Sequence, residues 1–239
     1  MSSGLIILLI ICLLLACAFE FVNGFHDTAN AVATVIYTNS LKPTVAVVYS
    51  GILNFTGVMT GGIAVAMGII NLLPMEVLLD NNVYHGVAMI LALLLSAIIW
   101  NLGTWWLGIP ASSSHALIGS ILGIGIAFYF LPDTGGNGLV NWDKVKDTGL
   151  ALLISPLLGF SAAILMMFVF KRTIKNEVIY KEPVLGKKPP IWIRMTLWTT
   201  CGLVSFFHGQ NDGQKGVGLI MIILIAMMPG YFAIAEKVT

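Results

Sequence analysis

Two short polar segments, each with a single aspartate, interrupt long apolar stretches of this chain. The first, GFHDTANAVAT, covers residues 24–34, and the second, HGQNDGQKGVG, covers residues 208–218. An ionised carboxylate at the depth of a bilayer is costly unless it is paired or hydrated. Asp27 and Asp212 are therefore candidates for binding a cation inside a membrane.

The two polar segments align with each other as an internal repeat. When residues 21–33 are placed over residues 206–218, four positions are identical and the two aspartates coincide. Polar interruptions at matching places in two halves are typical of secondary transporters, where broken helices present carbonyl groups to a cation and N–H groups to an anion. Gly24 and Gly209 have the backbone freedom for such breaks, so we expect a broken helix at each.

The aspartates and the histidines near them also have structural interpretations. The carboxylates could pair with each other, with Lys215, or with N–H groups at a helix end. His26 and His208 flank the two aspartates, and each could carry a coupling proton or serve only as a hydrogen-bond partner. The sequence leaves these alternatives open.

A third polar segment, GIPASSSHALIG at residues 108–119, places three consecutive serines before an apolar stretch. Pro110 disfavours helix at the residue before it, so we expect a helix to begin near His115. Hydroxyl groups beside the unpaired N–H groups of a helix start form an anion site that suits a tetrahedral oxyanion. The residues of this candidate site are Ser112, Ser113 and Ser114.

The same serines allow two other interpretations. A serine is a preferred N-cap, so the cluster could serve only to start the helix. A serine nucleophile with His115 as its base would instead indicate an intramembrane hydrolase. The chain has no G-x-S-x-G elbow in this segment, which disfavours the hydrolase.

Seven apolar stretches must position these segments. A helix needs about 20 mostly apolar residues to cross a bilayer. The fourth stretch is short for a crossing and follows the serines, which predicts a re-entrant hairpin buried in protein or facing a watery cavity. The stretches are residues 5–22, 45–70, 87–107, 117–131, 150–170, 195–207 and 217–235.

A polar linker at residues 171–194 divides the chain. It carries seven Lys or Arg residues against two Glu, which predicts a cytoplasmic location. We therefore expect a first membrane repeat at residues 1–170 and the start of a second at residues 195–239. Within the membrane, GVMTG at residues 57–61 and GSILG at residues 119–123 have the spacing that lets helices approach closely.

The composition excludes most other classes of protein. Hydrophobic residues make up 58% of the chain and charged residues 10%, with a mean hydropathy of +0.94. The net charge of +1 implies no basic surface for nucleic acid. The three cysteines lack CxxC spacing and are interpreted as small hydrophobic residues. LLACA at residues 14–18 resembles a lipoprotein cleavage box, but no positive charge precedes it, so we expect residues 5–22 to be a retained span.

Together, GFHDTANAVAT, GIPASSSHALIG and HGQNDGQKGVGLIM resemble the motifs of the inorganic phosphate transporter (PiT) family, in particular its bacterial low-affinity permease branch. That family carries an aspartate signature in each of two inverted repeats, and a P-x-S-x-[ST]-H-like motif on a re-entrant hairpin in each. The resemblance covers essentially the whole chain. It implies symport of inorganic phosphate with H⁺ or Na⁺, with no enzymatic activity and no cofactor. A divalent metal carried with phosphate is a further expectation for bacterial members.

The resemblance also implies roles for individual residues. His26 stands where many members have asparagine, which favours protons over sodium as the coupling ion. The implied ion-binding residues are His26, Asp27, Asn30 and Asp212. The implied substrate-binding residues are Ser112, Ser113, Ser114, Gln210 and Asn211, with Gln214 as a further candidate.

The sequence thus predicts an all-α membrane protein in the inner (plasma) membrane. The expected architecture is a multi-pass helical bundle with broken helices, a re-entrant hairpin and an inverted repeat whose second copy is incomplete. A second serine motif is absent, so we expect either a fragment or a site completed by a second chain or a homo-oligomer. The alternative function is a non-transporting membrane subunit. Expected partners are inorganic phosphate and membrane lipid, and not nucleic acid.

Overall fold

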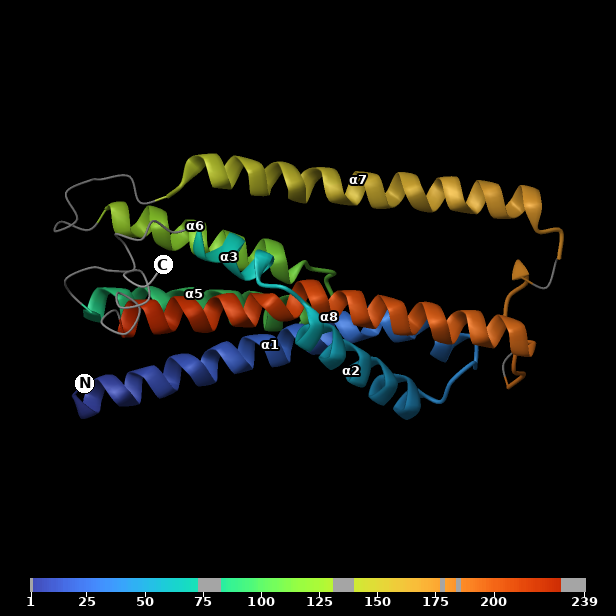
Figure 1. The fold of residues 1–239 in the computed structure, drawn as a ribbon, viewed down its shortest axis with the longest axis horizontal. Coiled ribbons are helices and arrows are strands. Elements are labelled where there is room, and N and C mark those ends of the chain that lie inside the picture. Colours follow the sequence, from blue (N-terminus) through green and yellow to red (C-terminus); the bar gives the residue numbers. More distant parts are fainter. Residues whose placement is uncertain (1, 73–82, 131–139, 177–178, 184–185, 229–239) are drawn as a thin grey trace.

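The structure, a computed structural model, describes residues 2–72, 83–130, 140–176, 179–183 and 186–228. The regular elements of this part of the chain are all α-helices, which confirms the all-α fold class (Figure 1). In chain order they are α1 (Ser3–Tyr37), α2 (Pro43–Thr60), α3 (Ala64–Ile70), α5 (Val83–Trp106), α6 (Ser113–Tyr129), α7 (Trp142–Thr173) and α8 (Ile191–Met227).

Several of these helices can cross a membrane. Among the described residues, α1, α7 and residues Tyr84–Trp106 of α5 are each long and apolar enough to do so, and the bent pair α2 and α3 qualifies when its two parts count as one span. These helices contain all or most of the predicted spans 5–22, 45–70, 87–107 and 150–170, whereas the other three predicted stretches fall in α6 and α8 and partly outside the described residues. The expectation of a multi-pass membrane protein is therefore confirmed.

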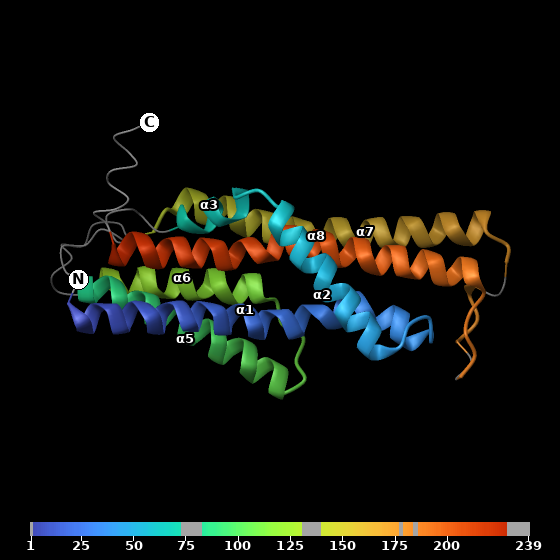
Figure 2. The same cartoon turned by 60° about the horizontal axis from the view of Figure 1, so that its bottom comes forward.

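α1 and α8 run in opposite directions and cross near the middle of the molecule (Figures 1 and 2). Asp27 on α1 lies beside His208 on α8, and Glu20 packs against Gly216. Moving two turns from Asp27 toward the start of α1 therefore leads to the residues that lie two turns beyond His208 on α8. The two aspartate segments meet at this crossing, and the opposite directions of the helices are those that an inverted repeat requires.

The breaks predicted at Gly24 and Gly209 are wrong, because α1 and α8 are continuous helices of 35 and 37 residues. The predicted spans 195–207 and 217–235 join within α8, and the end of the second lies outside the described residues. A glycine inside a helix costs only about 1 kcal/mol relative to alanine. Glycine and polar residues therefore do not interrupt a helix when neighbouring helices pack against it and pair with it.

The chain breaks instead between α2 and α3, whose axes differ by 73°. Gln214 on α8 occupies this break. Its Oε1 accepts a hydrogen bond from the backbone N–H of Val65 at 2.9 Å, and its Nε2 donates to the carbonyl of Gln210 at 2.7 Å. Because a helix start has N–H groups without intrahelical partners, the glutamine side chain stabilises the start of α3.

Close contact between α2 and α8 depends on glycines of both helices. A Cβ atom at Gly57 would collide with the carbonyl of Phe206, and one at Gly209 would collide with the carbonyl of Asn54. These contacts confirm that the GVMTG spacing serves close packing. At Gly119 and Gly123 of GSILG a Cβ atom would meet nothing within 4 Å among the described residues, so that segment does not pack closely here.

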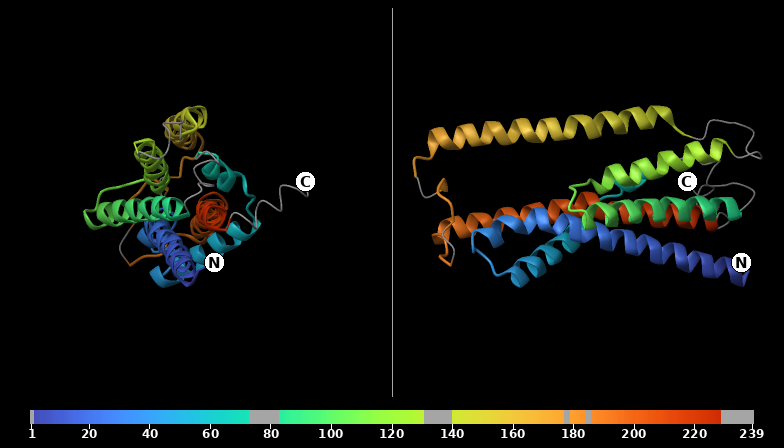
Figure 3. Two further views of the ribbon diagram at one scale, coloured as in Figure 1. Left: turned by 90° about the vertical axis from the view of Figure 1, so that its left-hand side faces the viewer. Right: turned by 180° about the vertical axis from the view of Figure 1, so that it is seen from behind.

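α5 and α6 form an antiparallel hairpin whose polar turn lies near the middle of the molecule (Figures 1 and 3). Gly108 adopts a φ of +66° in this turn, a conformation that side chains with a Cβ rarely take. With 17 residues, α6 is about 25 Å long, shorter than the hydrocarbon core of about 30 Å. These features suit a re-entrant hairpin, which stays a prediction.

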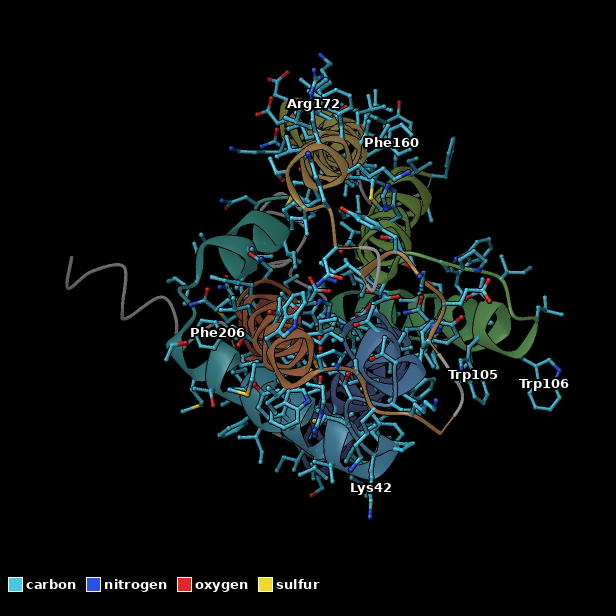
Figure 4. All side chains as sticks on the ribbon, turned by 90° about the vertical axis from the view of Figure 1, so that its right-hand side faces the viewer. Lys42, Trp105, Trp106, Phe160, Arg172 and Phe206 are labelled. Atoms are coloured by element: carbon cyan, nitrogen blue, oxygen red, sulfur yellow. The ribbon has the colours of Figure 1, made fainter. Side chains whose placement is uncertain are left out.

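α7 lies along the outside of the bundle (Figure 3), and none of its residues is buried. Figure 4 shows Phe160 and Arg172 projecting from α7, and Trp105 and Trp106 projecting from the outer end of α5. Both tryptophan side chains are exposed. α8 already begins at Ile191, so the last residues of the predicted linker are helical.

Candidate functional site

The two aspartates of the repeat face one imidazole at the crossing of α1 and α8. His208 Nε2 lies 3.2 Å from Asp27 Oδ2 and 3.4 Å from Asp212 Oδ2. The contact to Asp27 has the distance of an ion pair but not the geometry of a hydrogen bond. All three side chains are mostly buried, with exposed fractions of 19% to 29%. The repeated aspartates are therefore brought together, as the sequence predicted.

A buried lysine connects this cluster to the serine segment. Lys215 Nζ lies 2.8 Å from Asp212 Oδ2 and donates a hydrogen bond to Ser113 Oγ at 3.2 Å. Lys215 is only 3% exposed. An ammonium group removed from water needs nearly complete compensation by paired groups. The ion pair with Asp212 supplies this compensation. Pairing with Lys215 was one of the structural alternatives for the aspartates, and Asp212 adopts it.

The three serines have three different roles in the structure. Ser112 precedes α6 and caps it, because its Oγ accepts a hydrogen bond from the N–H of His115. Ser113 is buried and contacts Lys215. Ser114 is partly buried on the first turn of α6. The capping of α6 and the contact with Lys215 are thus made by two different serines.

Four of the predicted site residues lie away from the carboxylate cluster. His26 Nε2 contacts the backbone carbonyl of Asn101 on α5 at 2.9 Å. Asn30 and Asn211 are exposed, and Asn211 donates to the carbonyl of Phe207 in its own helix. Gln210 contributes its backbone carbonyl to Gln214. The assignments of His26, Asn30 and Asn211 to the ion and substrate site are not supported by this arrangement.

Helix periodicity explains these differences. Because successive residues of an α-helix point about 100° apart, His26 and Asn211 cannot share a face with the aspartates that follow them. Asn30 lies on the outer side of α1, with the exposed residues Ala33 and Thr34. The sequence predicted a helix broken at Gly24 and at Gly209, whereas the continuous helices turn neighbouring side chains toward different faces.

Several residues of the cluster were missed by sequence reasoning. Lys215 was considered only as a structural partner, and Glu20 and Asn23 were not considered at all. Glu20 and Asn23 lie on the same face of α1 as Asp27, at spacings of seven and four residues. A glutamate inside an apolar helix is itself a signal of function, which could have identified Glu20.

The arrangement offers one site for a cation and one for an anion. Ligand atoms of Asp27, His208 and Asp212 all lie within 4.8 Å of one another, close enough to bind one metal ion together. Lys215 and Ser113 present donors beside the start of α6, where the helix dipole is positive. The ammonium group of Lys215 and the positive end of the α6 dipole lie close together, so an anion is favoured between them.

The other features near the serines do not form a competing site. Ser112 Oγ lies 2.8 Å from His115 Nδ1, but this contact joins neighbours at a helix start, and no third residue of the described part of the chain orients the imidazole. A cavity of about 550 Å³ between α5 and α6 is lined by His115, Ser120 and Trp100, among others, and by none of the carboxylates. We therefore place the functional site at the crossing of α1 and α8 and not in this cavity.

Comparisons with known proteins agree with the motifs. A family model described as "Phosphate transporter family" matches residues 23–238. The low-affinity inorganic phosphate transporters PitA and PitB of Escherichia coli (strain K12) are each 43% identical to this chain, over 100% and 97% of it and over 50% and 48% of their own lengths. The probable low-affinity inorganic phosphate transporter of Bacillus subtilis (strain 168) is 38% identical over 92% of this chain and 61% of its own length. No solved structure matches the chain.

These relatives are named as transporters and not as enzymes. The chain spans about half the length of the Escherichia coli relatives that it matches. The family match includes both aspartate segments, the serine segment and the helices that bring them together. On these grounds the chain belongs to the phosphate transporter family.

Proposed function

We propose that this chain forms the substrate- and ion-binding part of a membrane transporter for inorganic phosphate. The observation that carries the proposal is the contact of Lys215 with both Asp212 and Ser113. It joins the aspartate of the second segment to the serine hairpin in the interior of the bundle. The names of the relatives supply the substrate.

Phosphate binds, in this proposal, between Lys215 and the start of α6. The ammonium group and the hydroxyl of Ser113 donate hydrogen bonds to the oxyanion, and the positive end of the helix dipole adds to the attraction. Asp212 holds the ammonium when phosphate is absent, so the buried lysine is never unpaired. Lys215 exchanges Asp212 for phosphate when phosphate binds and exchanges back when it leaves, so phosphate binding is reversible.

Coupling to a cation follows from the charge of the cluster. Bringing an oxyanion next to Asp27 and Asp212 adds negative charge to a site that already holds two carboxylates. A proton on His208, or a cation among the carboxylates and His208, offsets this charge, so that neither ion is stable there alone. The transport reaction is thus symport with H⁺ or Na⁺, and a divalent metal could accompany phosphate as cargo at Asp27, His208 and Asp212.

The alternative is a membrane subunit that binds phosphate without transporting it, or that needs a second chain. Two observations favour considering it. The chain spans about half the length of its Escherichia coli relatives, and every residue of α7 is unburied. In this case the site would be formed but would lack the elements that open and close access to it.

Radiolabelled phosphate uptake tests the proposal. The purified full chain is reconstituted into liposomes, and sodium and proton gradients are imposed in separate experiments. Uptake that depends on one gradient and is lost in Lys215→Met supports the proposal and identifies the ion. The exposed Glu182→Gln change serves as a control that should leave uptake unaltered. Phosphate binding without uptake would select the non-transporting subunit, and absence of binding would overturn the proposed function.

A further inference from the structure

A cavity of about 430 Å³ lies at the end of the molecule where the linker joins α8, and we call it the linker cavity. This end faces the viewer in Figure 4. Thr38, directly after α1, lines the cavity together with residues of the linker and of α8. The apolar lining residues are Ile179, Pro183, Pro189, Pro190, Ile193 and Leu197. The volume lies within the range of small-ligand sites, and a mostly apolar lining is typical of such sites.

The linker cavity also carries an excess of positive charge. Among the described residues that line it, the charged ones are Lys181, Lys187, Lys188 and Glu182. Lys187 and Lys188 make no ion pair or hydrogen bond with any residue that the structure describes. The single carboxylate can neutralise only one of the three lysines. Unneutralised ammonium groups beside an apolar wall favour an amphiphile with an anionic head group.

The first turn of α8 adds to the positive potential at this place. Pro190 lines the cavity and is the N-cap of α8, whose start has no side-chain cap, so its first N–H groups and the positive end of its dipole are available. The guanidinium of Arg194 lies 5.0 Å from the ring centroid of Trp198, and its buried Nε has no hydrogen-bond partner among the described residues. The other buried side-chain atoms without a partner in this part of the chain lie on α1 and α5, in Glu20, Asn23, Asp27 and Asn101.

The two ends of the molecule differ in charge. The linker has seven Lys or Arg residues against two Glu, whereas the start of α7, at the opposite end in Figure 1, has Lys144 and Lys146 with Asp143 and Asp147. The positive-inside rule places the linker end at the cytoplasmic surface. The cytoplasmic leaflet holds anionic lipids that attract Lys and Arg side chains next to a membrane helix. The linker cavity therefore lies where anionic head groups are concentrated.

We propose that the linker cavity binds an anionic phospholipid of the cytoplasmic leaflet. The head-group phosphate lies between Lys187, Lys188 and the start of α8, and the acyl chains follow the apolar wall at Ile193 and Leu197. A soluble anion would use the charges and leave this wall uncovered, so a lipid matches the whole lining better. The bound lipid contacts the end of α1 and the start of α8, and it should therefore stabilise the bundle. This binding requires no phosphate transport and is independent of the proposed function.

Native mass spectrometry of the purified full chain in detergent tests the site. Phosphatidylglycerol and phosphatidylcholine with identical acyl chains are added in separate titrations. We expect saturable binding of phosphatidylglycerol, tighter than that of phosphatidylcholine by about tenfold or more, together with an increase in Tm. Lys187→Gln with Lys188→Gln should remove this preference. The matched control, Lys144→Gln with Lys146→Gln, removes the same charge at the opposite end and should leave the preference unaltered.

The apolar wall is tested separately from the charges. Ile193→Ser keeps every charge of the linker cavity and should weaken the binding of phosphatidylglycerol. Glycerol 3-phosphate, a soluble anion without acyl chains, should not displace the lipid at equal concentration. Displacement by this anion would identify a soluble anion as the occupant and overturn the proposal.

The unchanged protein gives the decisive result, because that measurement does not depend on whether any variant folds. Equal binding of phosphatidylglycerol and phosphatidylcholine overturns the proposal. A preference that persists in Lys187→Gln with Lys188→Gln places the lipid elsewhere and also overturns it. Absence of phosphate binding and uptake with an intact preference for phosphatidylglycerol would reject the proposed function and retain this site.

Discussion

Lys215 on α8 donates a hydrogen bond to Ser113 at the start of α6, although 102 positions separate the two residues in the chain. Both side chains are buried. The contact joins the hairpin of α5 and α6 to the helix that carries the second aspartate. It therefore brings the candidate anion donors and the candidate cation ligands into one site.

Loss of Lys215 should impair both stability and phosphate binding. Lys215→Met leaves Asp212 partly buried without its ammonium partner, and breaking a buried ion pair costs about 3–5 kcal/mol at full burial. We expect a lower Tm by thermal unfolding in detergent and no phosphate binding by isothermal calorimetry. The double change Lys215→Met with Asp212→Asn should recover much of the Tm and none of the phosphate binding. Recovery of binding in the double variant would show that Lys215 only neutralises Asp212.

The serines should separate into one that binds and one that caps. Ser113→Ala removes the hydroxyl that accepts a hydrogen bond from Lys215, and a hydrogen bond to a charged group contributes about 1.5–3 kcal/mol. We expect the phosphate concentration for half-saturation to rise about tenfold or more. Ser112→Ala should instead lower stability by about 1 kcal/mol, because it removes the cap of α6, and leave the half-saturation unaltered.

Ser114→Ala is the matched control for these serine variants. A small effect is expected, since Ser114 is only partly buried. If Ser112→Ala and Ser113→Ala both changed only the Tm, the serine segment would be a helix start and not a phosphate site. Labelling by a fluorophosphonate probe would reveal a reactive serine and would favour the hydrolase that the sequence disfavoured.

Asp27 should be needed for coupling and not for folding. Asp27→Asn keeps the size of the side chain and removes the charge that faces His208. We expect gradient-dependent phosphate uptake into liposomes to be lost while insertion and the helical circular dichroism signal persist. Asp143→Asn is the control, since the side chain of Asp143 is 95% exposed. Unchanged gradient-dependent uptake in Asp27→Asn would remove this residue from the mechanism.

Two glycines of α2 should respond oppositely to the same substitution. Gly57→Ala places a methyl group against the carbonyl of Phe206, a backbone atom that cannot move aside without displacing α8. Overpacking of this kind costs about 1–3 kcal/mol, so the Tm should fall. Gly51→Ala meets nothing within 4 Å and should raise stability by up to about 1 kcal/mol through helix propensity. Equal Tm values for the two variants would show that α2 and α8 do not pack closely.

The sequence by itself determined the class of protein, the family and the chemical character of the site. Its composition predicts membrane helices because few charges interrupt the apolar stretches. The repeated aspartates were expected to meet, and Asp27 and Asp212 do meet at His208. A costly charge within an apolar helix must find a partner in the interior, so its position in the sequence already indicates a site.

Only the tertiary structure decided where the chain breaks and which polar residues share the site. Gly24 and Gly209 have the residue type for a break, yet the break falls between α2 and α3, where Gln214 from a distant helix satisfies the start of α3. Likewise, the sequence gives no basis for choosing Ser113 over its neighbours, because the choice depends on Lys215 reaching it from α8. Helical periodicity is encoded locally, whereas the face that becomes buried depends on where other helices lie. Long-range packing therefore selected the partners.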